Sequence, residues 1–207
     1  DTQAKKKLWA ESSYEFFGPP EVYGFSTDSK VLVIAGTLFV EARSAVHGGM
    51  HWRKDFERVG PSALCVADMN RQIMVGDNRG QLHLIDAKSG VCTNTFTSDQ
   101  KGFVTVLEPL DQEGKLVLFG TSQHRGACIL APADLRTLGP FVFPHKSVVH
   151  VACDTKKKLL AISDYFTVEV HKYEVKDSFV NFQLIHAHPK TESRIQRLEF
   201  SVCGDEM

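Results

Sequence analysis

Short apolar runs separated by turn-forming residues fill most of this chain. In the clearest stretch, 63–97, turn signals at 68–70, 76–80 and 86–90 separate four such runs. Gly80 and Asn78 can take the positive φ that a tight hairpin requires. Four strands joined by hairpins within about 35 residues predict one small antiparallel sheet, of the size found in a propeller blade.

The same strand–turn–strand pattern recurs along the chain. The residues that precede the first hairpin turn of each unit are Phe25, Ala67, Leu110, Cys153 and Phe200. The steps between them are 42, 43, 43 and 47 residues, on or just above the roughly 40–45 residues of a four-stranded propeller repeat. One blade cannot bury both of its faces, so blades must follow one another. The pattern predicts an all-β chain with a β-propeller fold.

The repeat divides the chain into an N-terminal tail, 1–20, and a propeller domain, 21–207. The predicted blades lie at about 22–56, 62–97, 103–143 and 147–185, with a partial blade at 195–207. The chain would thus hold about four four-stranded blades and the first strand of a fifth, 195–201. A lone first strand leaves an unpaired edge, so we expect this chain to be part of a larger ring, completed by a longer natural chain or by another chain. A complete four-blade ring is the alternative, which fits the leftover strand poorly. Residues 14–17 are interpreted either as part of a solvated tail or as a strand that closes the ring.

Three finer expectations concern individual elements. The outer strand of the third blade is expected at 138–143, and the third strand of the fourth blade at 167–171. No segment keeps an apolar period of 3.6 residues. We therefore expect no helix longer than about two turns.

The turn that ends the third strand of the second blade carries a family resemblance. Ile85-Asp86 stands where WD-repeat propellers have a Trp-Asp pair, and Ser89-Gly90 stands where they often have Thr-Gly. From 22 to 201 the chain resembles a WD-repeat β-propeller with degenerate repeats, none of which has the Trp-Asp dipeptide. The resemblance implies a ring of about seven blades. It also implies a non-catalytic scaffold that binds other proteins within larger assemblies.

Composition and charge narrow the range of functions. A hydrophobic fraction of 43% and a charged fraction of 24% are those of an ordinary globular protein. The net charge of −1 argues against a general nucleic-acid binder, which needs a basic surface. The five cysteines show no CxxC spacing, and as reduced core residues they favour an intracellular, cytoplasmic location. No membrane span or signal peptide is predicted; organellar import after removal of an N-terminal segment stays open.

Several groups of residues look chemical, and each has a simpler structural interpretation. His186 and His188 share one strand face, as metal ligands can, but no third ligand of suitable spacing follows. Cys128 lies near His124 but alternates within an apolar strand and has no orienting carboxylate. Aspartates that recur at one repeat position predict Asx turns: Asp28, Asp68, Asp111 and Asp154. We predict no catalytic residue, no metal and no cofactor.

Three functional hypotheses remain. The first is a scaffold for protein partners within a multi-subunit complex, and it is favoured because the first strands of the blades are apolar. The alternative is a propeller hydrolase or lyase, which would gather polar groups in its central channel. The third is an RNA-associated propeller in a ribonucleoprotein complex; Lys156-Lys157-Lys158 is its one basic cluster, which could also meet acidic lipid.

The candidate partner-binding residues lie on one predicted face. In a propeller, the turns between second and third strands share a face with the connections between blades, and WD-repeat proteins commonly bind partners there. On that face the sequence places Arg79, His124, Arg125, His145, Lys146, Tyr165 and Phe166. Arg, Tyr and Phe are residue types enriched in the cores of protein interfaces.

Overall fold

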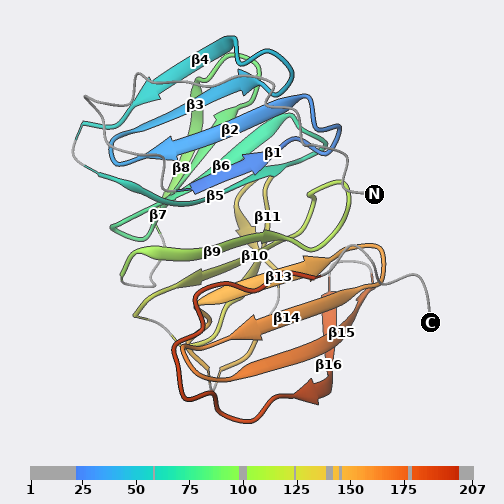
Figure 1. The fold of residues 1–207 in the computed structure, drawn as a ribbon. Coiled ribbons are helices and arrows are strands. Elements are labelled where there is room, and N and C mark those ends of the chain that lie inside the picture. The colour runs from blue at the N-terminus through green and yellow to red at the C-terminus, as the bar shows by residue number, and fades with distance from the viewer. Residues whose placement is uncertain are drawn as a thin grey trace, which may run out of the picture.

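The computed structural model describes residues 22–57, 59–97, 102–123, 125–138, 142–144, 146–176 and 179–200. These residues form four antiparallel four-stranded sheets and no helix. In each sheet the strands follow the order of the sequence, and the first strands β1, β5, β9 and β13 succeed one another through the middle of the molecule (Figure 1). The predicted all-β propeller fold is confirmed. The described residues contain no helix that could cross a membrane.

Blades one and two each have an outer strand of six residues. Blade one contains β1 (Val22–Phe25), β2 (Val31–Gly36), β3 (Phe39–Ser44) and β4 (Met50–Asp55). Blade two contains β5 (Pro61–Ala67), β6 (Gln72–Asp77), β7 (Gln81–Asp86) and β8 (Cys92–Thr97). Gly80 has a φ of 80°, so it takes the left-handed conformation expected for the tight turn between β6 and β7.

Blades three and four have outer strands of unequal length, with two residues in β12 and nine in β16. Blade three contains β9 (Val104–Pro109), β10 (Val117–Thr121), β11 (Cys128–Ala131) and β12 (Arg136–Thr137). Blade four contains β13 (His150–Asp154), β14 (Leu159–Ser163), β15 (Val168–Lys176) and β16 (Phe179–Ala187).

The outer strand of blade three begins earlier than predicted. Within the described residues, Arg136 and Thr137 pair with β11, and the Leu138 amide donates to the Ile129 carbonyl at 2.7 Å. An isolated bridge joins Ala127 to Val142. The middle of the strand predicted at 138–143, residues 139–141, lies outside the described residues.

The third strand of blade four is longer than predicted, and the expected fifth blade has no observed strand. β15 continues to Lys176 because apolar and polar residues keep alternating, and it pairs with β16 over nearly its whole length. Residues 195–200, predicted as the first strand of a fifth blade, belong to no sheet. A strand needs a hydrogen-bonded neighbour, and no described segment pairs with these residues. The ring-closing strand suggested at 14–17 lies outside the described residues.

The hydrophobic core lies between the blades. Three clusters of buried side chains fill the interfaces between blades one and two, two and three, and three and four. For example, Val33 of blade one packs in the same cluster as Ile73 of blade two, and Leu118 of blade three in the same cluster as Leu160 of blade four. Burial of apolar surface is the main favourable contribution to folding, so each blade depends on its neighbours for stability.

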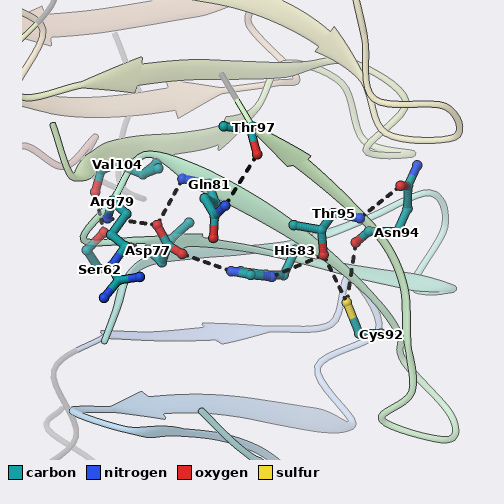
Figure 2. Close-up of polar contacts among 11 residues, drawn as sticks. Ser62, Asp77, Arg79, Gln81, His83, Cys92, Asn94, Thr95, Thr97 and Val104 are labelled. Atoms are coloured by element: carbon teal, nitrogen blue, oxygen red, sulfur yellow. Dashed lines mark hydrogen bonds and ion pairs between the residues drawn. The ribbon is translucent and has the colours of Figure 1, made fainter. Parts of the chain in front are cut away.

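Hydroxyl groups also join neighbouring first strands. The Ser62 hydroxyl on β5 donates to the carbonyl of Val104 on β9 at 2.8 Å (Figure 2). The Thr105 hydroxyl on β9 donates to the carbonyl of Val148, just before β13, at 3.2 Å. The two bonds are equivalent links across successive blade interfaces.

Candidate partner-binding site

One face of the molecule contains the turns between second and third strands together with the connections between blades. The Asn78 amide, in the β6–β7 turn, donates to the Gly60 carbonyl in the connection before β5 at 3.0 Å. The Gly126 amide, in the β10–β11 turn, donates to the Lys146 carbonyl in the connection before β13 at 2.7 Å. We call these turns and connections the turn face.

Both candidate arginines lie exposed on the turn face. Arg79 stands in the β6–β7 turn, where its amide donates to Oδ1 of Asp77 at 2.8 Å. Arg125 is exposed in the β10–β11 turn. The backbone holds both positions, since each lies in a turn closed by hydrogen bonds. His124 and His145 lie outside the described residues.

The candidate aromatic pair lies in the β14–β15 turn beside the segment that follows β16. Tyr165 and Phe166 are 40% and 36% exposed. The guanidinium of Arg194 lies 4.2 Å from the centroid of the Tyr165 ring, and Lys190 Nζ lies 5.4 Å from the Phe166 ring centroid. The Thr191 amide donates to the Phe166 carbonyl at 2.8 Å. The pair is held by cation–π and backbone contacts, yet each ring keeps an accessible part.

Lys146 is bound within blade four. Its Nζ donates to Oγ1 of Thr167 at 2.9 Å and lies 2.8 Å from Oε1 of Glu169. Burial alone would raise the pKa of Glu169, but hydrogen bonds from Lys146 and His171 outweigh this and hold the pKa below its usual value. Glu169 is therefore ionised at neutral pH, and Lys146 is already paired with a charge.

Blade two contains a buried polar network that the sequence did not reveal (Figure 2). Asp77 is fully buried; its Oδ1 accepts from the amides of Arg79 and Gln81, both at 2.8 Å. Its Oδ2 lies 3.0 Å from Nε2 of His83, and Nδ1 of that ring lies 3.4 Å from the Thr95 hydroxyl. Burial would raise the pKa of Asp77, yet these hydrogen bonds hold it below its usual value. The network fixes the turn that presents Arg79.

The first strands border a central cavity of about 650 Å³, which residues 197–200 also line. Polar side chains reach it, among them Glu108 of β9 and His150 of β13. Burial raises the pKa of Glu108 to about 7. Arg197, also at the cavity, donates to the Tyr23 hydroxyl at 3.3 Å. The interpretation of the first strands as apolar is therefore incomplete. It overlooked Glu108 near the end of β9 and His150 at the start of β13.

The other chemical candidates in the described residues are structural. No group of three or more His, Cys, Asp or Glu there is arranged to hold a metal ion. The rings of His186 and His188 contact each other edge to face, with their centroids 4.4 Å apart. Cys128 is buried in β11, and burial raises its pKa to about 12, so it stays a neutral thiol at neutral pH.

Comparisons with known proteins identify the fold but not the family. No family model matches the sequence, and a search of curated proteins found no relative. Among 1029 matching chains of known structure is one from the crystal structure of the mitotic checkpoint complex. It aligns with a TM-score of 0.69 and 12% identity over 87% of this chain. This chain spans 57% of that chain's length. Such a low identity shows the fold alone.

Proposed function

We propose that this chain is a non-catalytic, WD-repeat-like propeller that binds protein partners through the turn face as a subunit of a larger assembly. The observation that carries the proposal is the exposure of four side chains on that face: Arg79, Arg125, Tyr165 and Phe166. Arg and Tyr dominate the energetics of many protein interfaces. A merely solvated face would favour Ser, Asp, Lys and Gly instead.

The structural comparison supports the same class of function. The similar chain belongs to an assembly, the mitotic checkpoint complex, and the proposal gives this chain a comparable role as an interaction subunit. Because this chain spans 57% of the similar one, the proposal also places its four blades within a larger ring. The proposed location is intracellular, in the cytoplasm.

The proposal has a direct test on the turn face. Replacing Arg125 and Tyr165 together by Ala should leave folding intact, since exposed substitutions usually change stability by less than about 0.5 kcal/mol. Partner capture, measured against crosslinked partners of the wild-type full-length protein, should weaken by roughly 1–4 kcal/mol.

A matched control replaces one exposed arginine and one exposed phenylalanine on the face opposite the turn face. Arg136 is exposed next to the turn between β11 and β12, and Phe25 is exposed next to the turn between β1 and β2. Their double replacement by Ala should leave capture at wild-type strength. If the Arg125/Tyr165 variant folds and still captures every partner as the wild type does, the turn face is not the binding surface.

A hydrolase or lyase is the second candidate function, favoured by one observation. A carboxylic acid with a pKa of about 7, such as Glu108 in the central cavity, suits general acid–base catalysis near neutral pH. Glu108→Gln would abolish such an activity without changing partner capture at the turn face. Assays of the wild type and this variant against panels of hydrolase and lyase substrates separate the two candidates.

A further inference from the structure

A second cavity lies on the flank of blade four, beside its outer strand. It has a volume of about 480 Å³, within the range of small-ligand pockets. Phe143, Phe182 and Leu184 give it apolar walls, and Glu169 and His171 give it polar groups. Val142 and Pro144, from the described part of the connection between blades three and four, also line the cavity.

His171 is the unusual residue of this cavity. It is 7% exposed, and its Nε2 lies 3.0 Å from Oε2 of Glu169. An ionised carboxylate only accepts hydrogen bonds, so Nε2 carries the proton, and Nδ1 of the neutral ring is an acceptor. Nδ1 is buried and has no hydrogen-bond partner among the described residues. Buried polar atoms without a partner are rare in folded proteins.

Blade two shows how such a ring is satisfied within a blade. His83 also bonds a carboxylate through Nε2, and its Nδ1 contacts the hydroxyl of Thr95, the residue directly opposite on the outer strand. The residue directly opposite His171 on β16 is Leu184, which has no polar group. Blade four therefore lacks the hydrogen-bond donor that its counterpart supplies.

The charged pair and the aromatic rings of the cavity indicate which chemical group of a ligand would fit it. Glu169 is already matched by Lys146 at 2.8 Å, so the remaining need is for an uncharged donor. The rings of Phe143 and Phe182 meet edge to face with centroids 4.9 Å apart, an arrangement that extends well to a further aromatic ring. Tryptophan and tyrosine combine an aromatic ring with an N–H or O–H donor.

The neighbouring strand edge suits an extended ligand. β16 is nine residues long and contains no Lys, Arg, Asp or Glu, and its Phe179 and Leu184 are 61% and 51% exposed. By contrast, the outer strand β4 ends in Arg53-Lys54-Asp55. Outer edges usually carry charges that prevent pairing with another strand, and an edge without them can accept an added strand.

We propose that the flank of blade four binds an extended segment of a partner protein, which pairs with β16 and inserts a tryptophan or tyrosine side chain whose N–H or O–H donates to Nδ1 of His171. This surface adjoins the turn face at the connection before β13, but Arg125 and Tyr165 do not line it, and the inference does not depend on the function proposed for the turn face.

The test uses the full-length protein and a labelled peptide as long as β16, with alternating threonine and valine and a central tryptophan. A matched peptide carries 1-methyltryptophan, which keeps the ring and removes the donor. Fluorescence anisotropy should show saturable binding of the tryptophan peptide, about fivefold tighter than that of the methylated peptide, as expected for one hydrogen bond.

A pair of variants locates the binding site. Leu184→Thr would give His171 an internal hydrogen-bond donor like the one His83 has. The variant should therefore bind the tryptophan peptide about fivefold more weakly than the wild type does, and it should bind the two peptides with equal affinity. Ile185→Thr changes an equally exposed neighbour that does not line the cavity, and both affinities should stay within about twofold of wild type. The Arg125/Tyr165 double variant should bind the peptide normally, so failure at one surface is distinguishable from failure at the other.

Four outcomes would overturn the proposal. They are no saturable binding of the tryptophan peptide, equal binding of both peptides to the wild type, equal losses in Leu184→Thr and Ile185→Thr, and self-association of the peptide-free protein that Leu184→Thr abolishes in sedimentation. The last outcome would make a second copy of this chain the occupant of the flank.

Discussion

Blades two and four each place a histidine of the third strand against a buried or half-buried carboxylate, and they complete the arrangement differently. In blade two, His83 lies between Asp77 and Thr95, so both ring nitrogens have partners. In blade four, Nε2 of His171 contacts Glu169, and Nδ1 has no hydrogen-bond partner in the described part of the chain. The difference arises from the residue opposite each ring on the outer strand, which is Thr95 in β8 and Leu184 in β16.

The surroundings of the two rings are otherwise alike. A phenylalanine from the connecting chain packs on each histidine, with ring centroids 5.2 Å apart for Phe56 and His83 and 4.9 Å apart for Phe143 and His171. The comparison teaches that one residue on the outer strand decides between a closed structural network and a cavity with an unmet hydrogen bond. Two predictions test this view and a third tests the central cavity; they follow in order of expected effect.

The largest effect is expected at Asp77. Asp77→Ala leaves the Arg79 and Gln81 amides and the His83 ring without their acceptor, and it should lower the free energy of unfolding by roughly 3 kcal/mol. Glu169→Ala should cost about 1 kcal/mol, because the Glu169 side chain is 23% exposed and water can reach its partners. Urea unfolding of both variants measures the difference. Equal losses would contradict the distinction between a closed network and an open one.

A second prediction concerns Glu108, a carboxylate whose pKa is raised to about 7 by burial. The pKa of Glu108 is higher in the folded protein than in the unfolded chain. Its contribution to the free energy of unfolding is therefore fully present below about pH 4.5 and is lost as the pH rises through about 7. Glu108→Gln should therefore be more stable than wild type by about 1–3 kcal/mol at pH 8 and equally stable at pH 4. Urea midpoints at the two pH values measure this; a difference that does not change with pH would refute it.

The smallest effect is expected from making blade two resemble blade four. Thr95→Val removes the hydroxyl that contacts Nδ1 of His83 and should lower the free energy of unfolding by about 0.5–1 kcal/mol. Thr137→Val, on the exposed outer strand of blade three, is the matched control and should be neutral. A loss no larger than that of the control would mean that the contact in blade two is not stabilising.

The fold was predictable because repeated local chemistry determines it. Asp111 and Asp154 recur at one repeat position, and each accepts a backbone amide two to four residues later, from Lys115 and Lys156 at 3.0 Å. These aspartates close their turns as predicted, and alternation with a period of two gives the strands between them. The start of β12 at Arg136 was not predictable from the apolar pattern, because Arg136 and Thr137 are polar, exposed residues that precede the apolar run.

The candidate sites were only partly predictable. Exposed turn residues such as Arg125 and Tyr165 follow from the topology of a propeller. The partners of His83 and His171 do not, because they depend on which residue stands opposite on the next strand and on what the neighbouring blade leaves uncovered. Glu108 is a single acidic residue within an apolar strand, and its raised pKa follows from burial that exists only in the assembled blades.

The hydroxyl links between first strands have a consequence for how such a chain can change over generations. The Ser62–Val104 bond spans 42 residues and the Thr105–Val148 bond spans 43. The spacing is kept although blade three has a longer β10–β11 turn and a shorter outer strand than blade two. Insertion or deletion of one whole blade places a hydroxyl opposite a carbonyl again, whereas a shift of one residue within a first strand turns that hydroxyl to the other face. The complete blade is therefore the natural unit of duplication and loss in this protein.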